Sequence, residues 1–179
     1  MRVITGSARG RRLREPENYD IRPTTDKVKE AMFNIVQFSV PGARVLDLFA
    51  GTGQLGIEAL SRGAAECVFV DRSPEALRIV RENLKATGLE GPAKVQKYDS
   101  IAYLQTARDF DLVFLDPPYA TDLLEKAIKI AGGFDILSKN GIMICESPRE
   151  KELPELPEDR FSRREHSYGR IKLTTFTRI

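Results

Sequence analysis

The sequence contains two cysteines, one histidine and no tryptophan among its 179 residues. It has no CxxC pair, and one histidine with two cysteines supplies too few soft ligands for a structural zinc site. Cys67 and Cys145 each lie inside an apolar run, where a thiol usually packs as a small hydrophobic side chain. We therefore expect no metal ion and no disulfide bond.

Long apolar segments are also lacking. No run approaches the roughly 20 residues that a membrane-spanning helix requires, and the start, MRVITGSARGRR, lacks the apolar stretch of a signal peptide. With 41% hydrophobic and 30% charged residues, the composition excludes a disordered, collagen-like or coiled-coil protein. At roughly 150 residues per domain, the length predicts one compact globular domain, and the cytoplasm is the expected compartment.

The net charge of +2 conceals an uneven distribution. Residues 1–14 contain five arginines and no acid, and residues 160–179 carry a net charge of +5, which leaves −8 for the residues between them. Basic ends on an acidic body are typical of a protein that binds a polyanion, because arginine pairs well with phosphate. The alternative is a solvated edge strand protected by charge. The candidate residues for contacts with nucleic acid are Arg9, Arg11, Arg12, Arg14, Arg163, Arg164 and Arg170.

Strands and helices alternate through most of the chain. Apolar runs predict strands at 44–49, 67–71, 93–98, 111–116 and 142–147. Segments with helical spacing fill the gaps between them, and a further helix is expected to begin at Thr24, Thr25 or Asp26 and to end by Pro41 and Gly42. Apolar strands separated by helices indicate an α/β protein with a mostly parallel sheet covered on both faces.

Each end of the chain predicts a hairpin. Residues 2–14 contain two short extended pieces separated by glycines, and two strands joined around Gly169 are expected to close the sheet in antiparallel fashion. The predicted division is a basic N-terminal extension over residues 1–22 followed by a single domain over residues 23–179.

A glycine-rich turn follows the first expected strand of the sheet. Gly51, Gly53 and Gly56 form a G-x-G-x-x-G pattern between strand and helix, where glycines permit a tight turn and a close approach of the backbone to a ligand. Asp71 ends the next strand, where a carboxylate can accept hydrogen bonds from ribose hydroxyls. Together these residues predict a site for a cofactor that contains adenosine.

Two further carboxylates bear on the identity of this cofactor. Asp47 precedes the glycine turn, and its charge would repel the pyrophosphate of NAD but would suit the cationic groups of S-adenosylmethionine. Asp99 follows the third strand and is expected to accept a hydrogen bond from the adenine amine, with an ordinary cap for the helix that begins near Ser100 as the structural alternative.

Asp116-Pro117-Pro118-Tyr119 follows the fourth strand of this series. Because ligands in an open parallel sheet bind beyond the carboxyl ends of the strands, this loop is expected to border the same crevice as Gly51 and Asp71. The Asp116 carboxylate and the Pro117 carbonyl can accept both hydrogens of an exocyclic amine, and Tyr119 can stack on an extruded base. These residues predict methyl transfer to the amino nitrogen of a nucleobase, with a rigid turn as the structural alternative.

The sequence resembles class I S-adenosylmethionine-dependent methyltransferases, and within them the bacterial 16S ribosomal RNA guanine-N2 methyltransferases of the RsmD-like family. The resemblance covers nearly the whole chain. It is carried by ARGRRL, by RPTTDKVKEAMFN ahead of the first strand of the sheet, by LDLFAGTGQLGIEALSRGA and by FLDPPY. It implies a Rossmann-like fold with a seven-stranded sheet, and methylation of the 2-amino group of one guanine in the RNA of the maturing small ribosomal subunit.

The resemblance also assigns roles to individual residues. Asp116, Pro117, Pro118 and Tyr119 are the implied catalytic residues. The implied S-adenosylmethionine site comprises Asp47, Phe49, Gly51, Gly53, Asp71, Arg72, Asp99 and Ser100, with Thr24 and Thr25 near the methionine end or acting only as helix caps. The basic residues named above are then candidates for binding 16S RNA, in the free RNA or within the small subunit.

Three alternatives remain at this stage. A DNA adenine-N6 methyltransferase uses a similar tetrapeptide, but only about 30 residues of basic ends remain for a groove-reading region. An NAD-dependent oxidoreductase would share the glycine turn, and Asp47 argues against it. The third alternative is an RNA-binding module without catalytic activity.

Overall fold

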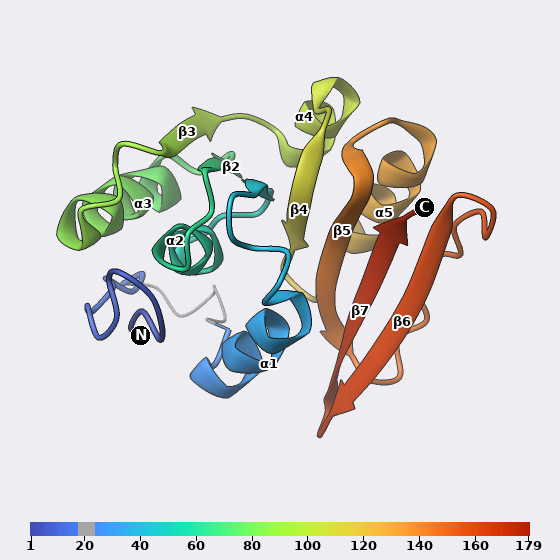
Figure 1. Ribbon diagram of the computed structural model, residues 1–179, viewed down its shortest axis with the longest axis horizontal. Coiled ribbons are helices and arrows are strands. Elements are labelled where there is room, and N and C mark those ends of the chain that lie inside the picture. Colours follow the sequence, from blue (N-terminus) through green and yellow to red (C-terminus); the bar gives the residue numbers. More distant parts are fainter. Residues whose placement is uncertain (18–23) are drawn as a thin grey trace.

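The computed structural model describes residues 1–17 and 24–179 (Figure 1). Arg22 and Pro23 of the RPTTD segment, and the end of the predicted 1–22 extension, lie outside the described residues. The elements of the described chain are α1 Asp26–Val36, β1 Arg44–Asp47, α2 Gln54–Ser61, β2 Glu66–Asp71, α3 Pro74–Thr87, β3 Ala93–Lys97, α4 Ser100–Thr106, β4 Phe110–Leu115, α5 Leu123–Gly133, β5 Leu137–Pro148, β6 Phe161–Tyr168 and β7 Ile171–Arg178.

The strands form one seven-stranded sheet in the order β3-β2-β1-β4-β5-β7-β6. The five strands from β3 to β5 are parallel, whereas β7 is antiparallel to β5 and to β6. The predicted mostly parallel sheet with an antiparallel C-terminal hairpin is therefore confirmed. Successive strands from β1 to β3 are added toward one edge of the sheet, and the strands from β4 onward are added toward the other edge. The strand order therefore reverses between β1 and β4. A crevice at this point is the usual ligand site of an open α/β sheet.

Two apolar cores cover the two faces of the sheet. Val45 of β1 packs with residues of α1, α2 and α3, such as Phe33 and Leu55. Its neighbour Leu46 packs on the opposite face with residues of α4 and α5, such as Leu104 and Ile128. Alternate residues of a strand point to opposite faces, which explains why the central strands are apolar at nearly every position. In Figure 1, α2 and α3 lie below β2 and β3, and α5 lies behind β5.

Most predicted bounds lie within two residues of the observed ones, and two differ by more. β5 begins at Leu137, five residues before the predicted start, and its register against β4 shifts between Phe110 and Leu112. The added segment contains Asn140, which adopts φ +64°. Asparagine tolerates this left-handed region and is common in turns, so the sequence here indicates a turn and not a strand. The helix expected to continue to Pro41 ends at Val36 instead.

The N-terminal segment is a closed loop fastened to α1 and α2. The expected hairpin is reduced to one antiparallel bridge between Arg2 and Arg12. The backbone N–H groups of Ile4 and Thr5 donate to the buried Glu58 carboxylate. The Lys29 ammonium, fully buried between α1 and this segment, donates to the Arg2 carbonyl at 2.6 Å. Buried charges of both signs therefore hold the basic segment in place.

The β6–β7 turn lies at the same edge of the sheet as the carboxyl ends of the parallel strands. Pro148, the last residue of β5, pairs with Ile171, the first residue of β7. Gly169 makes the turn at φ +59°, a conformation that glycine adopts without steric cost. Within residues 1–17 and 24–179, none of the helices has the length and apolar character needed to cross a bilayer.

Candidate active site

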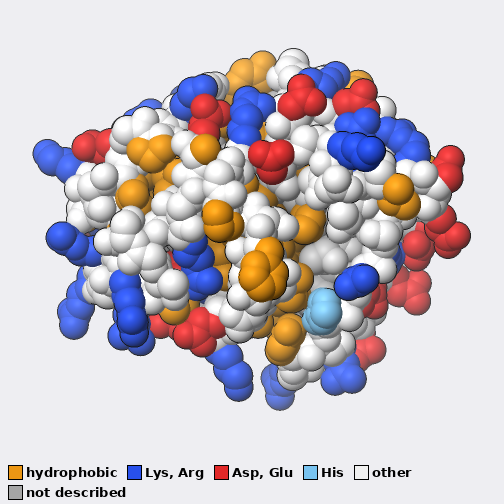
Figure 2. Space-filling view, viewed as in Figure 1, with side chains coloured by type: hydrophobic (Ala, Val, Ile, Leu, Met, Phe, Trp, Pro, Cys, Tyr) orange, Lys and Arg blue, Asp and Glu red, His pale blue; other side chains and the backbone are white. Residues whose placement is uncertain are grey.

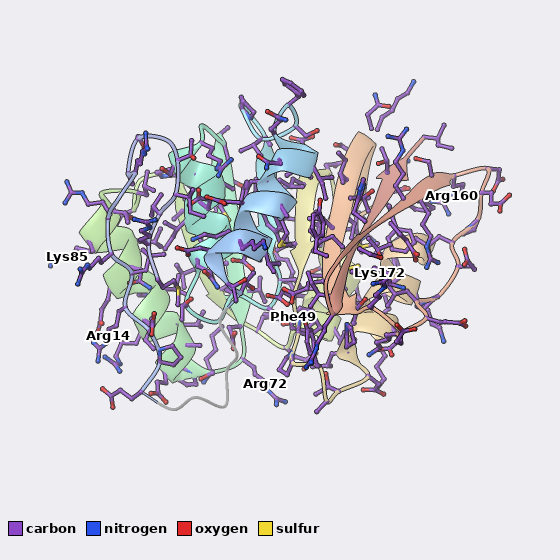
Figure 3. All side chains as sticks on the ribbon, turned by 90° about the horizontal axis from the view of Figure 1, so that it is seen from below. Arg14, Phe49, Arg72, Lys85, Arg160 and Lys172 are labelled. Atoms are coloured by element: carbon purple, nitrogen blue, oxygen red, sulfur yellow. The ribbon has the colours of Figure 1, made fainter. Side chains whose placement is uncertain are left out.

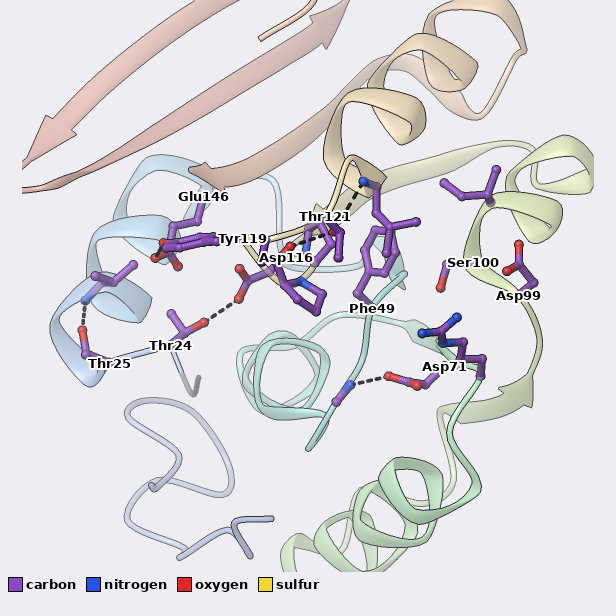
Figure 4. Close-up of a pocket in the computed structure, with 18 residues that line it drawn as sticks. Thr24, Thr25, Phe49, Asp71, Asp99, Ser100, Asp116, Tyr119, Thr121 and Glu146 are labelled. Carbon is purple, nitrogen blue, oxygen red and sulfur yellow. Dashed lines mark hydrogen bonds between the residues drawn. The ribbon is translucent and has the colours of Figure 1, made fainter. Parts of the chain in front are cut away.

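A cavity of about 390 Å³ lies at the carboxyl ends of β1, β2, β4 and β5 and at the starts of α1 and α4 (Figure 4). Most of the predicted site residues line it. Those that do are Thr24, Thr25, Phe49, Gly51, Asp71, Arg72, Asp99, Ser100, Asp116, Pro117, Pro118 and Tyr119. The expected crevice shared by the glycine turn and the aspartyl-diproline loop is therefore present. Asp47 and Gly53 do not belong to the lining.

The glycine turn is tied to the end of β2. The Gly51 N–H donates to Asp71 Oδ2 at 3.0 Å, while Asp71 Oδ1 accepts from the Ser73 N–H at 2.9 Å. Gly51 and Gly53 have φ values of +56° and +80°, which a side chain would strain. These bonds hold the Asp71 carboxylate in a fixed orientation at the edge of the cavity, where its remaining lone pairs can accept further hydrogen bonds.

Gly56 and Asp47 join the helix that follows the glycine turn to the strands beneath it. A Cβ on Gly56 would lie 2.3 Å from Cε1 of Phe69, so this glycine permits α2 to pack closely on β2. Asp47 Oδ2 accepts from the Gly56 N–H at 3.0 Å. Asp47 is 2% exposed, is bonded to Gly56 of α2 and does not line the cavity, so the predicted contact with the cofactor has no support here.

Burial also changes the charge of Asp47. Desolvation raises the pKa of this carboxyl from 3.8 to about 8, with smaller contributions from the like charges of Asp116 and Asp71, while the Gly56 N–H opposes the shift. A mostly neutral group at pH 7 does not repel pyrophosphate. The choice of S-adenosylmethionine over NAD therefore needs other evidence than the charge of Asp47.

Both expectations for Asp99 are compatible with the structure. Asp99 Oδ1 accepts from the Ala102 N–H at 2.8 Å and so caps α4, and the same side chain lines the cavity. Ser100 donates from its hydroxyl to the Leu48 carbonyl at 2.7 Å, which joins the start of α4 to the end of β1. Phe49 and Ile101 add apolar surface beside these polar groups.

The aspartyl-diproline loop is connected to α1 and to β5. Thr24 Oγ1 donates to Asp116 Oδ2 at 2.6 Å. Thr25 is the N-cap of α1 and accepts from the Val28 N–H, so its capping role is observed directly. The Tyr119 hydroxyl donates to Glu146 Oε1. The polar tips of this loop are thus held by hydrogen bonds, with the Asp116 carboxylate and the Tyr119 ring beside the cavity (Figure 4).

Glu146 is a cavity residue that the sequence analysis did not identify. It lies in β5, which was interpreted only as a buried strand, and its residue is 5% exposed. A recognisable signal was present, because Glu146 is a charged residue inside the apolar run IMICES. Its proximity to Asp116 depends on the pairing of β4 with β5, which the run itself does not reveal.

The arginines expected to contact nucleic acid fall into two groups. Arg9, Arg11, Arg12, Arg164 and Arg170 are exposed. Arg14 is also exposed but forms ion pairs with Glu82 and Glu17, and the partly buried Arg163 forms ion pairs with Glu155 and Glu165. Acidic neighbours therefore already pair with two of the seven candidates, and Glu82 is the one of these acids that is distant in the sequence.

The two basic ends of the chain lie on either side of the cavity. In Figure 3, which views the molecule from below Figure 1, Arg14 and Lys172 lie on opposite sides of Phe49 and Arg72. Figure 2 shows Lys and Arg side chains projecting from the lower left of its face, where Figure 1 places the N-terminal segment. A long polyanion across the cavity could contact both ends.

Cys67 and Cys145 are buried free thiols whose pKa values are raised, chiefly by desolvation. In the described ranges, no three histidine, cysteine or carboxylate side chains are grouped so that they could hold a metal ion.

The residues around the cavity fit S-adenosylmethionine. Asp71 and Asp99 offer carboxylate acceptors, which suit ribose hydroxyls and an adenine amine, and Phe49 and Ile101 offer apolar contacts for a purine ring. The cavity volume lies in the range of about 300–1,000 Å³ that is usual for small-molecule sites. These residues fit the adenosine that S-adenosylmethionine shares with NAD, and the choice between the two cofactors rests on the methyltransferase relatives described below.

This sheet, with a cavity between the glycine turn and the aspartyl-diproline loop, defines a class I methyltransferase. The model of the family described as "Conserved hypothetical protein 95" matches residues 1–177. The chain belongs to this family and is an RsmD-like methyltransferase.

Similar proteins cover nearly the whole chain. The Bacillus subtilis (strain 168) protein named "Putative rRNA methyltransferase YlbH" is 43% identical over 94% of this chain and 94% of its own length. Ribosomal RNA small subunit methyltransferase D of Escherichia coli (strain K12) is 35% identical over 99% of this chain and 90% of its own length. A solved structure titled "Putative methyltransferase yhhF from Escherichia coli" has a TM-score of 0.87 at 35% identity, covering 99% of this chain and 97% of that one.

Proposed function

We propose that the protein transfers a methyl group from S-adenosyl-L-methionine to the exocyclic 2-amino group of one guanine in 16S ribosomal RNA, as a step in maturation of the small ribosomal subunit. One observation carries the proposal: a single cavity is lined both by Asp71 and Asp99 and by Asp116 and Tyr119. Donor and acceptor can therefore meet in one site. The name of the Escherichia coli relative supports RNA of the small subunit as the substrate.

On the cofactor side, the chain supplies acceptors and apolar contacts. Asp71, oriented by the Gly51 and Ser73 N–H groups, would hold ribose hydroxyls. Asp99 would meet the adenine amine beside Phe49 and Ile101, and Arg72 lies at the exposed rim. When bound, the cofactor supplies a methyl group on a positively charged sulfur, which a neutral amine can attack.

On the substrate side, the loop after β4 prepares the amine. Asp116 and the Pro117 carbonyl would each accept one N–H of the exocyclic nitrogen, which favours a tetrahedral nitrogen whose lone pair points toward the methyl group. Thr24 keeps the Asp116 carboxylate in place for this task, and the Tyr119 ring would stack on the base. Methylation raises the acidity of the nitrogen, so its proton can pass to Asp116 or to water. Most of the rate then comes from positioning and electrostatics.

Exposed arginines at both ends of the chain would contact RNA phosphates. Arg9, Arg11 and Arg12 lie in the N-terminal segment. Arg164 lies in β6, and Arg170 lies in the turn between β6 and β7. The division into an extension over residues 1–22 and a methyltransferase domain over residues 23–179 remains part of this proposal. We also propose that the protein acts in the cytoplasm, where ribosomal RNA is available in bacteria.

The function is tested by identifying the methylated nucleoside. The protein is incubated with radiolabelled S-adenosylmethionine and, in separate reactions, naked 16S RNA, small subunits and duplex DNA, and the products are digested and separated. The expected product is labelled N2-methylguanosine from RNA or subunits. Labelled N6-methyladenine from DNA would contradict the proposal in favour of a DNA methyltransferase. RNA binding without label in any reaction would indicate a module without catalytic activity.

A further inference from the structure

Glu146 is a buried acid next to the Asp116–Tyr119 loop. The residue is 5% exposed and lines the cavity. Tyr119 donates to its Oε1, and among residues 1–17 and 24–179 no lysine or arginine forms an ion pair with it. A buried carboxylate is costly unless donors satisfy it. Its second carboxylate oxygen, Oε2, can accept a hydrogen bond from a ligand in the cavity.

The pairing of β4 with β5 places this acid beside Asp116. Leu115 pairs with Cys145 in parallel register, and Asp116 and Glu146 are the next residues along their strands. Neighbouring strands are roughly 4.8 Å apart, and residues in register point to the same side of a sheet. Two carboxylates consequently face the cavity side by side, one of them next to the Tyr119 ring (Figure 4).

Adjacent carboxylates match the donor pattern of guanine. The Watson–Crick edge of guanine carries an N1–H donor directly beside the 2-amino group. Adenine presents an unprotonated N1 acceptor there, which a carboxylate would repel. With the 2-amino group at Asp116, the N1–H lies on the side from which a second carboxylate can accept it.

We propose that Glu146 selects guanine by accepting a hydrogen bond from its N1–H, while its bond to the Tyr119 hydroxyl orients the stacking ring. The inference rests on the proposed function, because it assumes that the 2-amino group is the methyl acceptor. It adds a specificity-determining residue to the Asp116–Tyr119 loop.

The test compares two bases that differ at N1. One RNA carries guanine at the methylated position, and the other carries 2,6-diaminopurine, which keeps the 2-amino group but has an unprotonated N1. We expect wild-type kcat/KM to favour guanine by about 30-fold or more, because a site built for a donor rejects an analogue that lacks it. In Glu146→Gln, the amide can donate to the unprotonated N1, and the preference should fall by about tenfold or more. The difference at position 6 is the same for both enzymes and cancels in this comparison.

Tyr119→Phe is the matched control, because it removes the hydroxyl that donates a hydrogen bond to Glu146 and leaves the acid in place. It should slow both substrates alike and keep the guanine preference within about threefold of wild type. Glu146→Asp provides a second variant that retains the charge, and it should keep a preference for guanine despite a lower rate. Thermal unfolding and cofactor affinity of each variant confirm that the fold is intact.

Two results would overturn the inference in distinguishable ways. If Glu146→Gln slows both substrates by the same factor, Glu146 acts only through Tyr119, and the proposed guanine methylation stands. If the labelled product of the wild-type protein is a methylated adenine, the proposed function and this inference both fail.

Discussion

Thr24 Oγ1 donates to Asp116 Oδ2 over 2.6 Å, joining two residues that are 92 positions apart in the chain. Thr24 stands just before α1, and Asp116 directly follows β4. The bond therefore couples the segment ahead of the first helix to the loop that would hold the target amine. Gln54 at the start of α2 adds a second link, because its side-chain N–H donates to the Thr24 carbonyl at 3.3 Å.

Removing the Thr24 hydroxyl should slow methyl transfer without weakening the cofactor complex. Thr24→Val keeps the shape of the side chain but leaves Asp116 Oδ2 without this donor, so we expect the single-turnover rate to fall by about tenfold. Calorimetry should show a cofactor Kd within about threefold of wild type. Thr24→Ser, which restores the hydroxyl, should recover most of the rate. A Thr24→Val variant with full activity would show that the bond does not orient Asp116.

Asp116→Ala should abolish catalysis while cofactor affinity is retained. The variant removes one of the two acceptors for the amine, and the loss of such a preorganised contact typically costs about 100-fold or more in rate. Single-turnover methylation of the RNA and calorimetric titration with cofactor give the two readouts. Wild-type turnover in this variant would refute the role assigned to Asp116.

Asp71→Ala should weaken cofactor binding by about 1–3 kcal/mol. The variant removes the expected acceptor for ribose hydroxyls and also the bonds from the Gly51 and Ser73 N–H groups that shape the glycine turn. Glu75→Ala, an exposed carboxylate in the first turn of α3, is the control and should leave the Kd unchanged. Equal cofactor affinities for wild type and Asp71→Ala would show that Asp71 does not bind the cofactor.

The buried Asp47 predicts a dependence of stability on pH. Its pKa is about 8 in the folded protein against 3.8 ordinarily, so between these values the folded state binds more protons than the unfolded state. Stability from this group should therefore be present at acidic pH and decrease as the pH rises, by about 1 kcal/mol per pH unit.

Asp47→Asn isolates this contribution, because an amide oxygen can still accept from the Gly56 N–H but does not titrate. Urea unfolding of both proteins at pH 5, 6, 7 and 8 gives the difference in unfolding free energy, in which the other groups largely cancel. Wild type should lose stability relative to the variant as the pH increases. A constant difference across this range would contradict a raised pKa.

Charge reversal at Arg11 and Arg12 should weaken RNA binding and reduce its salt dependence. Both side chains are exposed, and the loss of two phosphate contacts should make the slope of log K against log salt shallower by about 2. Lys126→Glu with Lys129→Glu makes the same change of charge on α5, which covers the other face of the sheet. That control should bind as wild type. An unaltered slope in the Arg11 and Arg12 variant would place these residues outside the interface.

Much of the site was predictable because its residues are marked by short patterns. The glycine turn, Asp71 and the aspartyl-diproline loop each stand where an apolar strand ends, and parallel strands bring such ends to one edge of the sheet. The same periodicity predicted the sheet and its C-terminal hairpin. The start of β5 was missed because Asn140 and Gly141 indicate a turn, whereas the structure includes them in the strand beside a register shift.

The sequence by itself determined the alternation of strands and helices, the glycine turn and the chemistry of the loop after β4, because these depend on spacing within a few residues. Only the tertiary structure decided that Thr24 reaches Asp116, that Glu146 stands beside it, and that Asp47 is buried under α2 rather than facing the cavity. It also decided that Arg14 is paired with Glu82 of α3. Such contacts arise from strand pairing and burial between distant segments, and a local sequence pattern does not predict them.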